Sequence, residues 1–300
     1  MKKLLSLLDL STEELLHILD RADHLEQCWK SNNMPQVLNN RQVGLWFYGQ
    51  GFRNRVAFEI GAKAMGASVS YIPGELGIHE PLEDIGHYLD KWFSILIIRA
   101  KHHNDLLKVT ETTEASLINA RTDFNHPCEI IGDLQYIRKY RGSLDDLSLV
   151  FVGQIDNVLM SWFEAAVRLP ISVTQVAPKG YEINTETLNA LNKHAIGNIT
   201  VSHELNPLLA TADVLYTDCW PNAASSEEAS TIRETFLPYQ ITPAHLSRLP
   251  KNAMFLPCPP VTRGQEVSHD AMLSALCKNH QDKEYLLHAQ NALLEFIISA

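Results

Sequence analysis

The chain lacks several features that would assign it to common classes of protein. No apolar run approaches the roughly 20 residues needed to cross a bilayer, and Asp9, Glu13 and Glu14 interrupt the apolar N-terminus where a signal peptide would run. A basic surplus is also missing, because the formal net charge is −10. Contacts to nucleic acid phosphates require a basic face. We therefore expect neither a membrane nor a nucleic acid as a partner.

Paired cysteines are missing too. The five cysteines contain no Cys-x-x-Cys pair and lie far apart at Cys28, Cys128, Cys219, Cys258 and Cys277. An odd number of scattered thiols is typical of a reduced, cytoplasmic protein and not of a disulfide framework. The histidines, for example His102 and His103, lack the spacing of metal ligands, so we expect no metal and no cofactor.

The chain does contain short apolar runs that alternate with helical patterns. Its 300 residues, 45% of them hydrophobic and 20% charged, suit two globular domains. The predicted strands are 43–47, 68–72, 93–98, 116–119, 148–153, 171–176, 199–201, 214–217 and 254–256. The predicted helices are 12–29, one that follows 43–47 and its glycine-rich turn, 81–90, 105–113, 127–140, 160–169, 185–193, one that begins at 207–209, 242–248, 271–277 and 283–298. This alternation predicts an α/β protein of two doubly wound parallel-sheet domains, residues 1–140 with 283–300 and residues 141–282.

The stretch Phe47–Glu59 is the strongest local signal. It leaves a buried strand, passes through a glycine-rich turn and opens a helix, with Arg53 and Arg55 in the first helical turn. Free backbone N–H groups and the positive end of a helix dipole bind anions, so this stretch suits a phosphate or a carboxylate. A plain strand–helix turn with solvated arginines is the alternative.

Ligands of parallel sheets bind at the carboxyl ends of the strands, and in a two-domain protein usually in the cleft between the domains. We therefore expect the active site in that cleft. The segments that follow strands are 49–55, Arg99, 119–129, 153–157, 218–222 and 257–263.

Several motifs in the same order resemble those of the aspartate/ornithine carbamoyltransferases, and of the ornithine branch more closely. The resemblance covers nearly the whole chain. The matching stretches are the N-terminal 4–11, the loop 47–59, Arg99, Asn125-His126-Pro127-Cys128-Glu129, 153–157, Thr217-Asp218-Cys219-Trp220, 256–260 and Arg263-Gly264-Gln265-Glu266-Val267.

This resemblance implies a homotrimer that binds carbamoyl phosphate and an amino-acid-like amine. It implies donor or phosphate-binding roles for Gly51, Phe52, Arg53, Asn54, Arg55, Arg99, His126 and Glu129. It implies acceptor-binding roles for Asn157, Asp218, Asn222, Ala223 and Pro259, and catalytic roles for Arg99, His126, Cys258 and Asp218.

The donor residues depart from the family pattern at identifiable positions. The family's Ser-Thr-Arg-Thr-Arg loop is here Gly51-Phe52-Arg53-Asn54-Arg55, which keeps both arginines and loses the hydroxyls. Glu129 replaces an amide, and Ala292 aligns with a late arginine. A buried Glu129 needs a cationic partner, for which we expect one of the nearby arginines Arg53, Arg55 or Arg99.

Three hypotheses of function follow. The first is a carbamoyltransferase that acts on an amino-acid-like amine, an ornithine-like acceptor other than standard ornithine. The second is a family member whose altered donor site no longer uses carbamoyl phosphate and which binds another ligand or serves as a regulatory or assembly protein. The third, a nicotinamide-dependent oxidoreductase, is set aside because Gly153 is the only glycine of Gly-x-Gly-x-x-Gly at that turn.

Single residues also have structural explanations. His126 or Asp218 could cap a helix, and Cys258 could be a small buried hydrophobe.

Overall fold

The computed structural model describes residues 2–299, which form two compact units. The first unit comprises the residues up to Ile137, Asp156–Ser161 and those from Lys283 onward, and the second comprises Arg138–Ile155 and Trp162–Asp282. The sequence prediction puts 156–161 in the second domain, whereas hydrogen bonds between this segment and the loop before α5 join it to the first.

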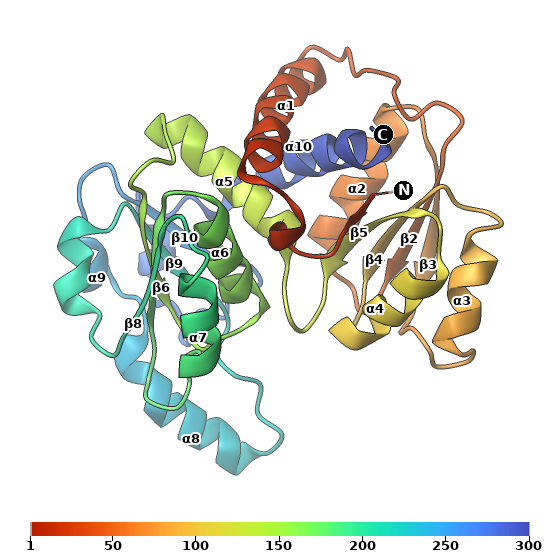
Figure 1. The fold of residues 1–300 in the computed structure, drawn as a ribbon. Coiled ribbons are helices and arrows are strands. Elements are labelled where there is room, and N and C mark those ends of the chain that lie inside the picture. The colour runs from red at the N-terminus through yellow and green to blue at the C-terminus, as the bar shows by residue number, and fades with distance from the viewer. Residues whose placement is uncertain (1, 300) are drawn as a thin grey trace. The chain divides into compact units, whose positions relative to one another are not determined.

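The sheet of the first unit is parallel, with the strand order β1-β5-β4-β2-β3. Its strands are β1 (Lys3–Leu4), β2 (Gln42–Phe47), β3 (Ser68–Pro73), β4 (Ile95–Arg99) and β5 (Ser116–Arg121). Its helices are η1 (Leu7–Asp9), α1 (Thr12–Lys30), α2 (Phe52–Ala64), α3 (Leu82–Leu89), α4 (His103–Thr112), most of α5 (Pro127–Arg141) and most of α10 (Asn279–Ile298). Helices α3 and α4 cover one face of this sheet, while α1, α2 and α10 lie over the other (Figure 1).

Local sequence explains where these elements begin. The side chain of Ser11 accepts a hydrogen bond from the Glu14 N–H, and the Glu14 carboxylate accepts one from the Ser11 N–H. This capping box starts α1 one residue later, as predicted. On β4, Leu96 and Ile98 are buried beneath α3 and α4, which explains its continuous apolar run.

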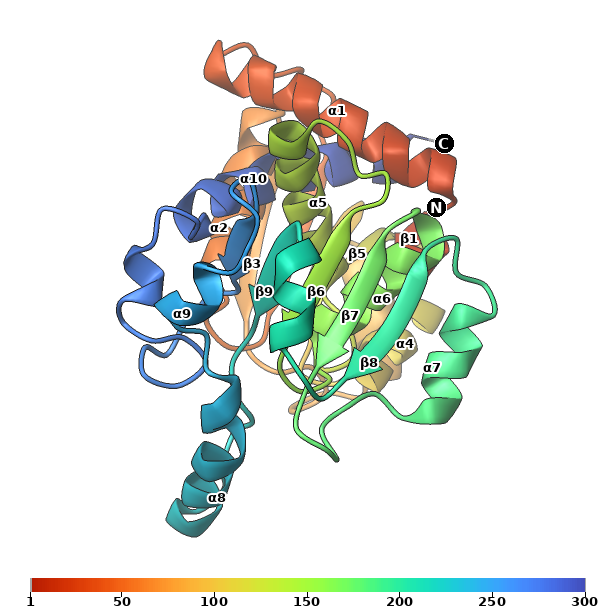
Figure 2. The same ribbon diagram turned by 90° about the vertical axis from the view of Figure 1, so that its left-hand side faces the viewer.

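The second unit has a parallel sheet of its own, with the order β10-β9-β6-β7-β8 (Figure 2). Its strands are β6 (Ser148–Val152), β7 (Ser172–Val176), β8 (Asn198–Ser202), β9 (Val214–Thr217) and β10 (Met254–Pro257). Its helices are most of α6 (Asn157–Arg168), α7 (Thr185–Asn192), η2 (Asn206–Thr211), α8 (Ser226–Phe236), η3 (Leu237–Tyr239), α9 (Pro243–Leu246) and η4 (Ala271–Leu273). The two parallel sheets confirm the predicted α/β class.

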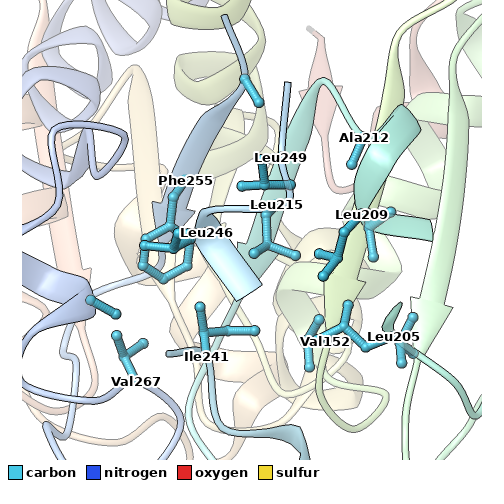
Figure 3. Packing of buried hydrophobic residues seen from close by; sticks show 14 residues of the cluster. Val152, Leu205, Leu209, Ala212, Leu215, Ile241, Leu246, Leu249, Phe255 and Val267 are labelled. Atoms are coloured by element: carbon cyan, nitrogen blue, oxygen red, sulfur yellow. The ribbon is translucent and has the colours of Figure 1, made fainter. Parts of the chain in front are cut away.

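One core of the second unit lies between the sheet and the segments around η2 and α9. Leu215 and Phe255 of the sheet pack there against Leu209 and Leu246 (Figure 3). The backbone ladder pairs β9 and β10 side by side, in the register Leu256↔Tyr216 and Pro257↔Thr217. The segments that follow these two strands therefore start from neighbouring positions.

Two local predictions differ from the structure, and strand β1 and helix α8 were not predicted. The predicted helix 271–277 is wrong beyond Leu273, because Phe255 of the edge strand β10 pairs with Leu276 and Lys278 through backbone hydrogen bonds and holds this stretch extended. The helix predicted to begin at 207–209 is the short 3-10 helix η2. Helix α8 was not predicted, since its polar sequence buries only Ile232 and Phe236.

Among residues 2–299, no helix combines the length and the apolar content that crossing a bilayer requires. No disulfide joins the five cysteines, all of which lie in this described range.

Candidate functional site

The loop between β2 and α2 is built around two glycines in the left-handed region, Gly49 at φ 65° and Gly51 at φ 40°. Gly51 is the N-cap of α2 and offers no side-chain hydrogen bond to the helix, so the first N–H groups of α2 have no cap from this residue. A Cβ atom on Gly51 would lie 2.9 Å from Cδ and Nε of Arg99. Glycine here lets the Arg99 side chain lie against the loop, where the family pattern has serine.

Replacing Gly51 by alanine is expected to displace Arg99 and to weaken anion binding about tenfold, besides the roughly 1–2 kcal/mol that a left-handed alanine costs. Gly49→Ala is the matched control, because its backbone is also left-handed and its Cβ would meet nothing within 4 Å. Phosphate titration by calorimetry and urea unfolding separate the two effects. Equal phosphate affinity in both variants would contradict the role of the Gly51–Arg99 contact.

The loop residues Arg53, Asn54 and Arg55 point to different surroundings. Arg53 is half-buried, and its guanidinium lies 4.8 Å from the centre of the Phe52 ring. Arg55 forms an ion pair with Glu59 at 3.1 Å and lies over the Tyr71 ring. The geometry therefore favours Arg53 over Arg55 as the loop's anion ligand.

Asn54 is buried, and its polar atoms are bonded to protein groups. Its Nδ2 donates to the carbonyl of Ala120 at 2.8 Å, and its Oδ1 accepts from Nε2 of Gln290 at 2.8 Å. Its side chain also lies 3.4 Å from Nε2 of His126, and the donor-binding role predicted for Asn54 stays a prediction.

His126 is buried at the start of α5. Its backbone N–H donates to Oγ of Ser161 at 2.8 Å, which fixes the main chain at this point. Burial lowers the pKa of the imidazole to about 3; Glu129 opposes this shift, and the cations Arg99, Arg121 and Lys283 add to it. His126 is therefore neutral near pH 7, with one ring nitrogen a donor and the other an acceptor.

Glu129, three residues further along α5, is buried beside His126. The expected partner for it was an arginine, and this expectation is wrong in detail. Lys283 lies near the start of α10. Its Nζ is 2.7 Å from Glu129 Oε1 and 2.7 Å from Asp133 Oδ1. Burial alone would raise the pKa of Glu129, but Lys283, His126 and Arg53 lower it below its usual range.

Two residues of this neighbourhood, Lys283 and Gln290, were missed by sequence reasoning, and a third, Arg121, was given no role although it lies in the selected segment 119–129. Arg121 ends β5 and pairs in register with Arg99, after a shift in the ladder between Ile98 and Arg99. Lys283 and Gln290 carry no local signal, because only the packing of α10 brings them beside α2 and α5. Ala292 of that helix lies with His17, Ile18 and Arg21 of α1 instead.

The predicted acceptor and catalytic residues of the second unit follow β9 and β10. Asp218 is half-buried and accepts a hydrogen bond from the Cys219 N–H at 2.7 Å, while Cys258 is buried and its N–H donates to the Thr217 carbonyl at 2.8 Å. The structure thus brings Asp218 and Cys258 to neighbouring strand ends. Pro259 is half-buried, and Asn222 and Ala223 are exposed on the segment that leads to α8.

Asn157 belongs to the first unit by its contacts. Its side-chain Nδ2 donates to the Thr122 carbonyl at 2.6 Å, in the loop that leads to His126. In this structure its amide nitrogen therefore supports the loop beside the donor residues.

Glu266, in the segment after β10, is buried. One of its oxygens accepts a hydrogen bond from the Thr262 N–H, and the other has no hydrogen-bond partner within residues 2–299. Burial raises the pKa of this carboxyl to about 7, and the negative charge of Asp218 contributes in the same direction.

When the pKa of a carboxyl is higher in the folded state than in the unfolded state, the folded protein binds one more proton at any pH between the two pKa values. The free energy of unfolding therefore falls as pH rises from the unfolded-state pKa to the folded-state pKa. Glu266→Gln is expected to remove about 1–3 kcal/mol of this fall between about pH 5 and 7.5. Urea unfolding at both pH values measures it. The exposed Glu204→Gln in the same unit serves as the control, and an unchanged pH dependence in Glu266→Gln would contradict the assignment.

One group within residues 2–299 has the geometry of metal ligands: Glu26, Glu284 and His288, whose ligand atoms lie within 4.8 Å of one another. Lys30 Nζ pairs with both carboxylates of this group. Because an ammonium already neutralises these carboxylates, we assign no metal to the group.

Comparison with known proteins matches the two parts of the chain to the two domains of a single protein family. Residues 2–139 match the carbamoyl-P binding domain of the aspartate/ornithine carbamoyltransferases, and residues 145–297 match their Asp/Orn binding domain. The predicted donor residues from Gly51 to Glu129 lie inside the first match. The chain therefore belongs to the aspartate/ornithine carbamoyltransferase family, and it is a transferase.

Its similarity is to the ornithine branch. It is 33% identical to the ornithine carbamoyltransferase of Methanosphaera stadtmanae over 304 residues, covering 99% of both chains. It is 31% identical to that of Psychrobacter sp., covering 98% of this chain and 96% of the relative. The structure of ornithine carbamoyltransferase from Pyrococcus furiosus superposes with a TM-score of 0.93 at 27% identity, covering 98% of this chain and 96% of that one.

Proposed function

We propose that the chain transfers the carbamoyl group of carbamoyl phosphate to the side-chain amine of ornithine. The observation that carries the proposal is the set of groups around the start of α2. They are Arg53, Arg99 at its contact with Gly51, and the neutral His126, in the part of the chain that matches a carbamoyl-P binding domain. The ornithine carbamoyltransferases among its relatives support ornithine as the acceptor.

The chemistry follows from the charges of these groups. The N-terminal amides of α2 and the guanidinium groups of Arg53 and Arg99 hold the phosphate dianion. The amine nitrogen of the acceptor attacks the carbamoyl carbon, and the carbonyl oxygen becomes negative as the tetrahedral intermediate forms. A donor on His126 stabilises that oxygen. The bond from carbon to the phosphate oxygen then breaks, phosphate leaves, and the amine loses a proton.

On the acceptor side we propose that Asp218 binds the ammonium group of the amino acid, with Cys258 and the Pro259 backbone beside it. These assignments follow the motif matches and the adjacent ends of β9 and β10. The predicted location of the site in a cleft between the domains stays a prediction.

Steady-state assays with carbamoyl phosphate and a panel of amino acids test the proposal. Phosphate release that depends on ornithine, with an equal amount of ureido product, is the expected result. Release with a different amine would correct the acceptor alone. If no amine supports turnover and carbamoyl phosphate does not bind in calorimetry, the alternative of a family member with an altered donor site replaces the proposal.

We further propose that the active form is a homotrimer. An apolar stripe runs along α2 at helical spacing, with Phe52 56%, Val56 39% and Ile60 41% exposed, and Tyr71 of the edge strand β3 is 42% exposed nearby. Such a stripe on an edge of the sheet suits a contact with a second copy of the chain.

Ile60→Glu is therefore expected to reduce the mass measured by light scattering from three chains to one, because a charge would be buried in the contact. Ile196→Glu is the control, since Ile196 is exposed in the second unit, far along the chain from the stripe. A trimer that survives Ile60→Glu, or a wild-type monomer, would contradict this assignment.

A further inference from the structure

Arg121 is a cation at the carboxyl end of β5, in the first unit. Its side chain is half-buried, and within residues 2–299 it forms no ion pair and no side-chain hydrogen bond. The nearest carboxylate along the chain, that of Asp123, lies 3.1 Å from Nδ1 of His102 and accepts a hydrogen bond from the His103 N–H. A half-buried guanidinium has lost part of its hydration, so the missing negative charge is expected to come from a ligand.

A shift in the strand ladder decides on which face of the sheet Arg121 lies. Up to Ile98 the residues of β4 and β5 pair in step, and Ile98 pairs with Asn119. The next residue of β4, Arg99, pairs with Arg121, so β5 contains one extra residue at Ala120. Side chains alternate between the two faces of a sheet, and neighbours in register share a face. The extra residue therefore moves Arg121 from the face of Asn119 to the face of Arg99.

The backbone holds the ends of three neighbouring strands in one row along the edge of the sheet. The Tyr48 N–H donates to the Arg99 carbonyl at 2.8 Å. The Ala100 N–H donates to the Arg121 carbonyl at 3.0 Å. Because the strands lie in the order β2-β4-β5, this edge carries first the loop after β2, then Arg99, then Arg121 (Figure 1). Neighbouring strands are about 4.8 Å apart, so the two arginines start from adjacent positions.

This row places Arg121 at one end of the proposed donor site. Arg99 lies against Gly51 at the start of α2, where we place the phosphate. Arg121 lies one strand further on, away from the phosphate loop. Burial is the main cause of the low pKa of His126, and the charges of Arg99 and Arg121 lower that pKa further, so both act on the imidazole. Like charges on neighbouring strands repel each other, and an anionic atom that contacts both arginines relieves this repulsion.

We propose that Arg121 is a catalytic residue that contacts the carbamoyl oxygen and stabilises its negative charge while the amine adds to the carbon. The proposal rests on the proposed carbamoyl transfer. The electron pair of the carbonyl π bond moves to the oxygen as the new C–N bond forms, and it returns as the bond to the phosphate oxygen breaks. Arg121 transfers no proton in this step, because a guanidinium stays charged throughout. Its contribution is a fixed positive charge beside the oxygen.

Two stable phosphonates test this assignment without turnover. Phosphonoacetate carries a carboxylate where carbamoyl phosphate carries its carbamoyl group, and methylphosphonate carries only a methyl group. In calorimetric titrations, Arg121→Leu is expected to weaken the binding of phosphonoacetate about 10–100-fold and that of methylphosphonate less than about threefold. Arg41→Leu is the control, because it removes the same charge from an exposed site just before β2, at the opposite end of the strands.

The comparison of the two probes has two contrary outcomes. Equal losses for both phosphonates in Arg121→Leu would make Arg121 a phosphate ligand and overturn the proposal. Unchanged binding of both probes would show that Arg121 contacts neither end of the donor, which overturns it as well.

Kinetics separate stabilisation of the oxygen from binding of the acceptor. Arg121→Leu is expected to lower kcat about 100-fold, the size of losing one donor to a developing oxyanion, with each KM changed less than about threefold. Arg121→Lys should recover part of kcat, because lysine keeps the charge and lacks the planar fork. A raised KM for ornithine at unchanged kcat would assign Arg121 to the carboxylate of the acceptor and overturn the proposal.

Urea unfolding shows that a loss of activity is not a loss of folding. Since Arg121 has no ion-pair partner within residues 2–299, Arg121→Leu should leave the unfolding midpoint unchanged or raise it. If phosphonoacetate binding depends on Arg121 but the wild type turns over with no amine, the anion-binding role of Arg121 stands and carbamoyl transfer fails. If the wild type transfers the carbamoyl group and Arg121→Leu has the same kcat, carbamoyl transfer stands and the role of Arg121 fails.

Discussion

Replacing Lys283 by methionine is expected to lower the free energy of unfolding by about 3–5 kcal/mol, because it leaves buried carboxylates without their cation. The Lys283 side chain is only 11% exposed, and those of Glu129 and Asp133 are 9% and 2% exposed. The same substitution should abolish most of the activity, since a buried, uncompensated Glu129 repels the phosphate of the donor.

The pH dependence of this loss has a defined sign. In the wild type the pKa of Glu129 is lowered in the folded state, so its ionised form contributes stability above the unfolded pKa, and this contribution is lost as pH falls through the folded value. Without Lys283, burial raises the pKa instead. Lys283→Met should therefore be more destabilised at about pH 8 than at about pH 5.5.

Urea unfolding at both pH values measures this effect, and Glu129→Gln added to Lys283→Met provides the matched control. The double variant should regain part of the stability and lose part of the pH dependence, since one of the two carboxylates has become an amide. A loss below about 1 kcal/mol, equal at both pH values, would mean that Lys283 acts as an ordinary surface charge.

The second large effect concerns phosphate binding by Arg53 and Arg55. The sequence gives both arginines of the loop the same predicted role, whereas their contacts in the structure differ. Arg53→Gln is expected to weaken the binding of carbamoyl phosphate and of inorganic phosphate about 10–100-fold, the range for a charge-assisted hydrogen bond. Arg55→Gln should change both affinities by about twofold or less, because Arg55 pairs with Glu59 on the helix surface. Lys63 still neutralises Glu59 in that variant, at 2.7 Å.

Calorimetric titrations of the two variants decide between these arginines. Comparable losses in both would show that Arg55 leaves Glu59 to reach the ligand. A loss confined to Arg55→Gln would reverse the assignment.

Much of the fold follows from patterns within short segments. Apolar runs bounded by turn residues identified the parallel strands β2 to β10 but not the two-residue β1, and the Ser11–Glu14 capping box identified the start of α1. Prediction failed where distant backbone decides the conformation, as at Leu276, which the edge strand β10 holds extended. It also failed for α8, which has too few apolar residues for a clear periodicity.

The candidate site shows the same division. Arg99 and His126 were found because they follow strands and match motifs. Lys283 and Gln290 were not, because their roles depend on how α10 packs against α2 and α5, which no local pattern encodes. The partner of Glu129 was therefore assigned to the arginines nearest in the motif, and the hydrogen bonds of Asn54 were not foreseen.

Carbamoyl transfer is tested most directly by following a carbon-13 label from carbamoyl phosphate in the presence of ornithine. The label is expected to appear in the ureido group of the product, with one phosphate released for each, and Arg53→Gln is expected to slow this transfer far more than Arg55→Gln. A label that stays in carbamoyl phosphate or its hydrolysis products, with ornithine and with every other amine, would contradict it.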